Sequence, residues 1–139
     1  MQTKQLRNEL MGSLEQILKL EAFSALDDYL QGETLVLHCL GMQCCPLCPS
    51  DLIGVLHLSR SRITAAVAAL RRKGLVETRA SEADRRRVEV TITAEGRKII
   101  AEKRQRLHAY FDRLVDGLGE EETHRLIGLI GRCAEVMEE

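Results

Sequence analysis

Hydrophobic residues recur at helical spacing along most of the chain. Between residues 4 and 30 they return every three or four positions, which predicts one long amphipathic helix that ends at Gly32. This stripe consists of Leu6, Leu10, Leu14, Ile17, Leu18, Leu26, Tyr29 and Leu30. The same spacing predicts three shorter helices over 33–40, 49–58 and 59–74. Gly41 is expected to end the first of these, and Gly74 the last.

The periodicity changes after residue 74. Residues 75–79 are predicted to form a strand, and Val88, Val90 and Ile92 alternate with polar residues as in a second strand. The charged segment 80–87 between them is predicted to be an exposed hairpin loop. Helical spacing then returns for a long helix from Thr93 to about residue 118, and for a last helix through Leu126, Ile127, Ile130, Ala134 and Met137.

The predicted order of elements is α-α-α-α-β-β-α-α. Two short helices joined by a tight turn and followed by a β-hairpin make a winged helix-turn-helix. The predicted fold is therefore mainly α with a small β-hairpin, in which long helices flank this core. The first helix and the last two are too long for a small core to cover their apolar stripes, so we expect them to pack against a second copy of the chain.

Charge is distributed unevenly along the 139 residues. Residues 57–106 hold 14 Lys and Arg against 6 Asp and Glu, whereas the two flanks together hold 6 against 15. A basic middle between acidic flanks favours one surface that faces a polyanion. The flanks carry neither a signal-peptide pattern nor an apolar run of membrane-spanning length, so a cytoplasmic protein is expected.

Motifs of the common enzyme classes are missing from the sequence. There is no Gly-rich phosphate loop, no G-x-S-x-G and no H-E-x-x-H, and the four His residues are scattered. The sequence therefore argues against an enzyme.

Residues 45–99 resemble the MarR family of bacterial transcription regulators. The most specific pieces are "LSRSRIT", "LRRKGLV", "DRRRVEVTIT" and "TAEGRKI". The resemblance implies one MarR-like domain over 1–139, with a winged helix-turn-helix lobe at 33–93 and a helical dimerisation lobe formed by 1–32 and 94–139. It also implies a homodimer that binds pseudo-palindromic, double-stranded operator DNA and usually represses transcription.

The fourth predicted helix is the expected recognition helix. If Ile63, Val67 and Leu70 turn inward, small and hydroxyl side chains face outward and can approach base edges. We expect base contacts from Ser61, Arg62, Thr64 and Ala65, with Ser59 and Arg60 nearer to phosphates. Arg85, Arg86 and Arg87 at the hairpin tip are expected in a minor groove, because narrow minor grooves attract arginine. Asp84, which matches the family's acidic residue in the wing, would hold one of these arginines.

Four of the five cysteines lie close together in "HCLGMQCCPLC", at the turn into the third predicted helix. On the family pattern, Cys45 stands where Gly is usual and Cys48 where a helix-capping Thr is usual. A helix N-terminus stabilises a thiolate, which is the form that binds metals and reacts with oxidants. Cys45 and Cys48 are therefore the leading candidates for a site that Cys44, Cys39 or His38 would complete.

Three interpretations of this cluster stay open. The first is a site for zinc or another thiophilic metal, such as Cu(I), arsenite, Cd or Hg. The second is a redox or electrophile switch that uses the same cysteines. The third is packing, since free cysteine is often a small buried hydrophobe; we expect this for Cys39 and Cys133. A metal-binding or redox-buffering protein that does not bind DNA is the alternative from another functional class.

Two other inputs follow from the resemblance. Some relatives sense zinc through His and acidic side chains, and Glu33, His108 and Asp112 are the residues here that suggest such a second site. Other relatives respond to phenolic or lipophilic acids in a pocket between the dimerisation helices and the DNA-binding lobe.

Overall fold

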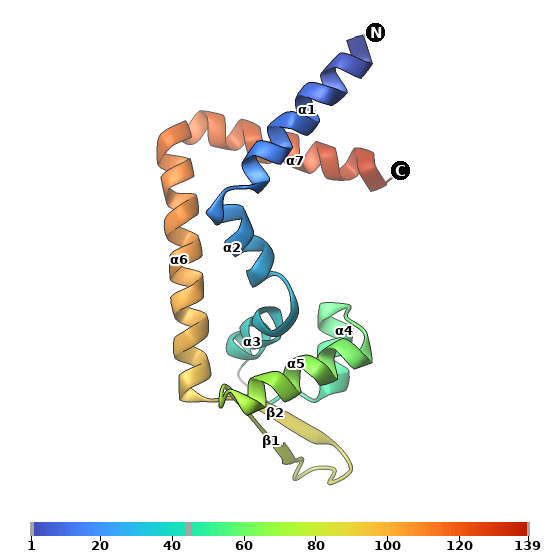
Figure 1. Ribbon diagram of the computed structural model, residues 1–139. Helices are drawn as coiled ribbons and strands as arrows, with labels where there is room; N and C mark the ends of the chain where they lie inside the picture. The colour runs from blue at the N-terminus through green and yellow to red at the C-terminus, as the bar shows by residue number, and fades with distance from the viewer. Residues whose placement is uncertain (1, 44–45, 139) are drawn as a thin grey trace. The chain divides into compact units, whose positions relative to one another are not determined.

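The computed structural model describes residues 2–43 and 46–138, and it contains helices and one hairpin in the predicted arrangement (Figure 1). The elements are α1 (Gln2–Leu18), α2 (Glu21–Tyr29), α3 (Gly32–Met42), α4 (Pro49–Leu56), α5 (Arg60–Arg72), β1 (Val76–Ala80), β2 (Val88–Ile92), α6 (Ala94–Leu118) and α7 (Glu120–Glu138). The prediction of a mainly α fold with a winged helix-turn-helix core is confirmed. The chain forms two compact units, which divide within α6 after Arg104.

The first unit has a core of aliphatic side chains around α3 and α5. Ile63 and Leu70 of α5 are at most 1% exposed, and Val67 is 8% exposed, so the predicted inner stripe of this helix is confirmed. They lie among other buried side chains of α3, α4 and the hairpin: Val36, Leu37, Leu52, Val76 and Val90. Full burial of such a side chain contributes about 1.5–3 kcal/mol, so this cluster fixes how α5 is presented.

β1 and β2 pair antiparallel, with Thr78 opposite Val90 and Arg79 opposite Glu89. The pair Arg79–Glu89 is also joined by an ion pair of 3.3 Å. Leu47 forms an isolated antiparallel bridge to β2: its N–H donates to Val90 O over 3.3 Å, and Val90 N–H donates to Leu47 O over 2.7 Å. The turn before α4 is thereby attached to the hairpin.

Thr93 organises the junction between the hairpin and α6. Its Oγ1 accepts a hydrogen bond from Gly96 N–H (3.0 Å), which caps α6, and donates one to Gly74 O (2.8 Å). Its N–H donates to Leu75 O over 3.0 Å. Gly96 packs directly on the backbone of Leu75, which explains why this position carries no side chain.

The prediction of one helix over residues 4–30 is wrong, because the structure has a break between α1 and α2. Leu20 adopts an extended conformation and its carbonyl accepts the first hydrogen bonds of α2 from Phe23 and Ser24. No Gly, Pro or capping side chain marks this break in the sequence. The break follows from packing: Tyr29 of α2 is buried, whereas α1 has no buried residue.

Two predicted helix ends also shift. Gly41 does not end α3, which continues to Met42; a Cβ at Gly41 would make only ordinary contacts with Ile100 and Ile92. α4 ends at Leu56 rather than at residue 58, because His57 takes the left-handed conformation (φ 56°) that closes a helix.

The second unit consists of the end of α6 and α7, joined at Gly119 with φ 81°. Many apolar side chains of α7 are exposed, among them Ile127, Ile130 and Met137. Cys133 is exposed as well, so the expectation that it is a core residue is wrong for the single chain. None of the helices described between residues 2 and 138 is long and apolar enough to cross a bilayer.

Candidate nucleic-acid interface

The outer face of α5 is the first part of the candidate interface. Ser61, Thr64, Ala65, Ala68 and Arg72 are all exposed, on the side of the helix opposite the buried stripe. Their side chains are short except at Arg72, so the backbone of α5 can approach a nucleic-acid groove closely. The structure thus brings three of the four predicted base-contacting residues, Ser61, Thr64 and Ala65, onto one accessible face.

Ser59 and Arg60 lie where α5 begins. Ser59 Oγ accepts a hydrogen bond from Arg62 N–H over 3.2 Å and lies 3.2 Å from Ser61 Oγ, so Ser59 is the N-cap. Replacing such a cap with Ala typically costs about 1 kcal/mol. Ser59 therefore has a structural role in addition to any contact with a phosphate, whereas Arg60 is exposed.

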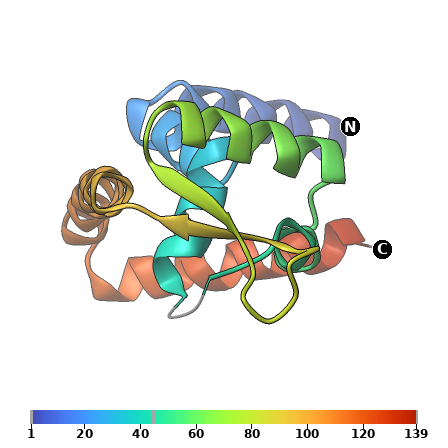
Figure 2. The ribbon, with the colours of Figure 1, turned by 90° about the horizontal axis from the view of Figure 1, so that it is seen from below.

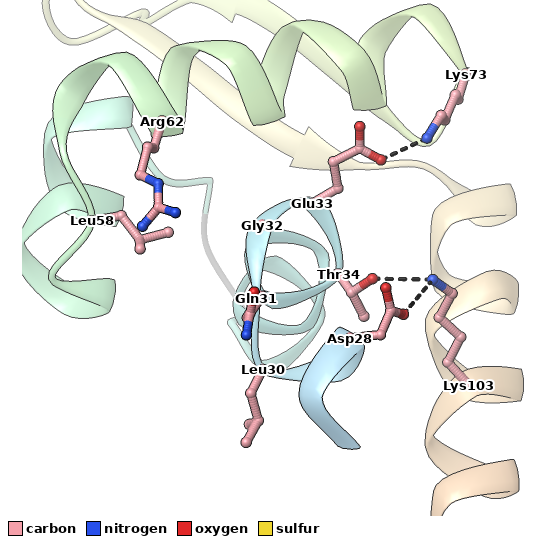
Figure 3. A pocket seen from close by; sticks show the side chains of 10 residues that line it. All are labelled: Asp28, Leu30, Gln31, Gly32, Glu33, Thr34, Leu58, Arg62, Lys73 and Lys103. Atoms are coloured by element: carbon pink, nitrogen blue, oxygen red, sulfur yellow. Dashed lines mark hydrogen bonds and ion pairs between the residues drawn. The ribbon is translucent and has the colours of Figure 1, made fainter. Parts of the chain in front are cut away.

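Arg62 is oriented differently from its neighbours. Its side chain lines a cavity of about 690 Å³, whose wall comprises Asp28, Leu30, Gln31, Gly32, Glu33, Thr34, Leu58, Lys73 and Lys103 as well (Figure 3). Its guanidinium makes no hydrogen bond or ion pair within the described part of the chain, whereas Lys73 pairs with Glu33 (2.6 Å) and Lys103 with Asp28 (3.5 Å). The Arg62 side chain can therefore contact either a ligand in the cavity or a nucleic acid.

The hairpin loop is closed by its own hydrogen bonds. Ser81 is 7% exposed; its N–H donates to Arg87 O (2.9 Å), and its Oγ accepts from Asp84 N–H (3.4 Å). Asp84 Oδ1 accepts from the backbone N–H (3.1 Å) and from Nε (3.2 Å) of Arg86. The side chain of Arg86 is nevertheless 91% exposed. Asp84 thus holds Arg86 while leaving the end of its guanidinium accessible.

The three wing arginines do not lie in equivalent positions. Arg85 is exposed and has no ionic partner among residues 2–43 and 46–138. Arg87 turns toward α4 instead, where its Nη2 lies 3.7 Å from Asp51 Oδ1 and 3.5 Å from Ser50 Oγ. Ser50 and Asp51 were not among the predicted site residues, because they are far from the wing in the chain and approach it only in the fold.

The candidate thiol site is described only in part, since Cys44 and Cys45 lie outside the described residues. Cys48 is half-buried at the N-cap of α4, where its N–H donates to Asp51 Oδ2 over 2.9 Å. Cys39 is 6% exposed on α3, and burial raises the pKa of its thiol, which disfavours the thiolate. Among the described residues no group of three or more His, Cys, Asp or Glu is arranged to hold a metal ion.

His38 is part of a different arrangement from the one predicted. Its Nδ1 lies 2.6 Å from Tyr29 Oη, which also accepts a hydrogen bond from Arg104 Nε over 3.3 Å. Burial, and secondarily Arg104, lowers the pKa of His38. The ring is therefore neutral and linked to α2 and α6.

The members of the second predicted metal site have separate surroundings. Glu33, at the start of α3, is paired with Lys73. His108 and Asp112 lie on the part of α6 that belongs to the second unit, and both are exposed. Neither unit contains all three residues, and no group of three metal-binding side chains is found among the described residues.

Comparisons with known proteins match this geometry. Residues 31–96 match the model of the winged helix DNA-binding domain. No sequence among the curated proteins matches the chain significantly. The YusO protein from Bacillus subtilis is 22% identical, with a TM-score of 0.72 over 95% of this chain and 96% of that one.

Two other solved structures are similar over almost their whole length. MepR, a transcription regulator of the Staphylococcus aureus multidrug efflux pump MepA, is 20% identical, with a TM-score of 0.67 over 94% of this chain and 97% of that one. FabT from Streptococcus pneumoniae, solved in complex with DNA, is 21% identical, with a TM-score of 0.67 over 98% and 97%. Residues 31–96 thus match a winged helix DNA-binding domain, and the chain as a whole shares its fold with these solved structures.

Proposed function

We propose that the chain is a sequence-specific DNA-binding transcription regulator that binds its operator as a homodimer and represses transcription. The observation that carries this proposal is the pairing of an exposed, small-residue face on α5 with an exposed arginine, Arg86, on the adjacent hairpin. α5 would enter the major groove and the hairpin a flanking minor groove. The clustering of 14 Lys and Arg within residues 57–106 supports contact with phosphates.

Asp84 and Arg86 have a defined part in this mechanism. An arginine that enters a minor groove binds more tightly if it is held in an extended position beforehand, because less side-chain entropy is lost on binding. Asp84 binds Arg86 through Nε, so the two terminal nitrogens stay available for bases or sugars. Arg85, also exposed, would contact the phosphates beside the groove.

The test begins with selection of binding duplexes from a random-sequence library by the full chain. Two inverted half-sites about 10 base pairs apart, centre to centre, are expected for a dimer. On the selected duplex, Arg86→Ala should weaken binding roughly five- to hundred-fold. Arg97→Ala removes another exposed arginine, on α6, and serves as the control. Equal effects of both variants, or recovery of no common sequence, would contradict the proposal.

The homodimer is supported by exposed apolar side chains on α1. Leu6, Leu10, Leu14 and Leu18 are 49–64% exposed on one helix, more than a soluble protein leaves uncovered without a partner. We expect sedimentation at twice the mass of one chain. Leu10→Glu should yield monomers, whereas Val55→Glu, at a similarly exposed position on α4, should not.

The cavity beside Arg62 supports control by a small molecule. Its wall carries three cationic and two acidic side chains, and Leu30 and Leu58 are its only large apolar members among the residues described. This lining favours a small anion with an apolar part over a purely lipophilic ligand. An anion bound to Arg62 would withdraw this side chain from DNA, so it should lower DNA affinity in wild type but not in Arg62→Ala.

Control through the cysteine turn is the second candidate input. A thiophilic metal or a disulfide at Cys45 and Cys48 would act where Cys48 begins α4 and where Leu47 pairs with Val90. Metal content and thiol titration of anaerobically purified protein distinguish the possibilities. A bound metal that is lost in Cys48→Ser, but kept in Cys133→Ser, supports a metal site. Loss of two thiols under mild peroxide supports a redox switch, and unreactive thiols without metal exclude both.

A further inference from the structure

Arg87 connects the wing loop to the start of α4. Its backbone closes the loop, because its N–H donates to Asp84 O and its carbonyl accepts from Ser81 N–H, both over 2.9 Å. Its guanidinium leaves the loop and reaches the first turn of α4, at 3.7 Å from Asp51 Oδ1 and 3.5 Å from Ser50 Oγ. Arg87 thereby closes the wing loop with its backbone and contacts the first turn of α4 with its side chain.

Asp51 uses its two carboxylate oxygens for two different elements. Oδ2 accepts the N–H of Cys48 over 2.9 Å, which caps α4, while Oδ1 faces Arg87. Among the described residues, the other hydrogen-bonded link between this turn and the hairpin is the backbone bridge of Leu47 to Val90, in the middle of β2. The part of the hairpin beyond buried Val90 is mostly exposed, so the core does not hold the loop against pivoting, whereas the attachment at Arg87 does. Figure 2 shows the hairpin loop extending beyond the strands, where such pivoting would displace it most.

We infer that Asp51 is a positioning residue for the wing: by binding Arg87 it fixes the loop 81–87, and with it the direction of Arg85 and Arg86, relative to α4 and α5. This inference rests on the proposed DNA-binding function and assigns Arg87 to the protein rather than to DNA. The side chains of Arg87 and Asp51 are 51% and 44% exposed, so the ion pair is accessible to solvent and weak. Its effect is on the mobility of the loop, with little effect on global stability.

If Arg87 contacts DNA instead of the protein, Asp51→Asn should change DNA affinity in the opposite direction. If Arg87 contacts DNA, Asp51 competes for it, so Asp51→Asn should free Arg87 and tighten DNA binding. If Asp51 positions the wing, Asp51→Asn should weaken DNA binding although it removes a negative charge. Asn can still accept the Cys48 N–H, so α4 keeps its cap in this variant. The sign of one substitution therefore separates the two roles.

The first experiment needs no DNA. Amide hydrogen exchange of Ser81 and Arg87 is measured in the full chain for wild type, Asp51→Asn, Arg87→Gln and the double variant. Each single variant should exchange roughly two- to five-fold faster at these amides, the range for one exposed ion pair, and the double variant no faster than either. Glu89→Gln removes an acidic partner of Arg79 on the same hairpin and should leave these amides unchanged. Unchanged exchange in both single variants would overturn the inference.

The second experiment uses the duplex recovered by selection. Asp51→Asn and Arg87→Gln should both weaken binding, with less than additive effect in the double variant and with the salt dependence of wild type. A salt slope that falls by about one in Arg87→Gln, or tighter binding by Asp51→Asn, would assign Arg87 to a phosphate and overturn the inference. If wild type selects no duplex, the proposed function fails, while the exchange experiment still decides whether Asp51 holds the wing.

Discussion

Gly96→Ala should destabilise the protein although alanine is the better helix former. Gly96 lies in the first turn of α6, where an added Cβ would overlap the carbonyl oxygen of Leu75 and lie 2.8 Å from Ile92 Cγ1. The carbonyl cannot move easily, because it accepts the N–H of Thr93 over 3.0 Å and Thr93 in turn caps α6. The side chain therefore meets fixed backbone rather than a flexible neighbour.

The magnitude follows from two opposing contributions. Replacing Gly with Ala within a helix gains at most about 1 kcal/mol in conformational free energy. Overpacking costs about 1–3 kcal/mol, and an obstacle made of backbone corresponds to the upper end. Gly96→Ala should therefore lower the free energy of unfolding by about 2 kcal/mol. Gly54→Ala is the matched control: it lies in α4, has no atom within 4 Å of the added Cβ, and should gain about 0.5–1 kcal/mol.

Urea unfolding followed by circular dichroism measures both variants at one fixed protein concentration, since a dimer's stability depends on concentration. With a slope of about 2 kcal/mol per molar urea, the midpoint of Gly96→Ala should fall by about 1 M and that of Gly54→Ala should rise. If Gly96→Ala is as stable as Gly54→Ala, the packing of α6 on Leu75 described above is refuted.

Three further variants test the core and the ionic contacts. Ile63→Ala removes a side chain that is 0% exposed and should cost about 2–5 kcal/mol in urea unfolding; a loss below about 1 kcal/mol would contradict its burial. Burial lowers the pKa of His38 below its ordinary 6.5, so the unfolded chain binds more protons and stability should decline as the pH falls through and below 6.5. His38→Gln should reduce this decline, and an equal decline in the variant would exclude His38 as its cause. Glu33→Gln breaks an exposed pair with Lys73 and should change stability by less than about 1 kcal/mol; a larger loss would show that the pair is not solvent-screened.

The sequence predicted the winged core because its signals are local. Ser59 and Thr93 cap helices through hydrogen bonds within three residues, and Val88, Val90 and Ile92 alternate with polar residues as in a strand, in which Val90 is buried. These caps and this alternation involve residues close together in the chain, so the order of residue types along the sequence is enough to predict them.

The missed features depend on contacts between distant segments. The break at Leu20 has no local signal and follows from the burial of Tyr29 against α3. The pairing of Arg87 with Asp51 joins residues far apart in the chain, so the sequence assigned all three wing arginines the same role. His38 was considered a metal ligand because its partner Tyr29 could not be inferred from spacing.

The central claim is that α5 and the wing bind duplex DNA in a sequence-specific manner. The most direct measurement compares the affinity of the full chain for its selected duplex and for a shuffled duplex of the same composition, over a series of salt concentrations. We predict a preference of about a thousandfold or more at physiological salt, and an affinity whose logarithm falls linearly with the logarithm of salt concentration. Equal affinity for the two duplexes, or binding that salt does not weaken, would contradict the claim.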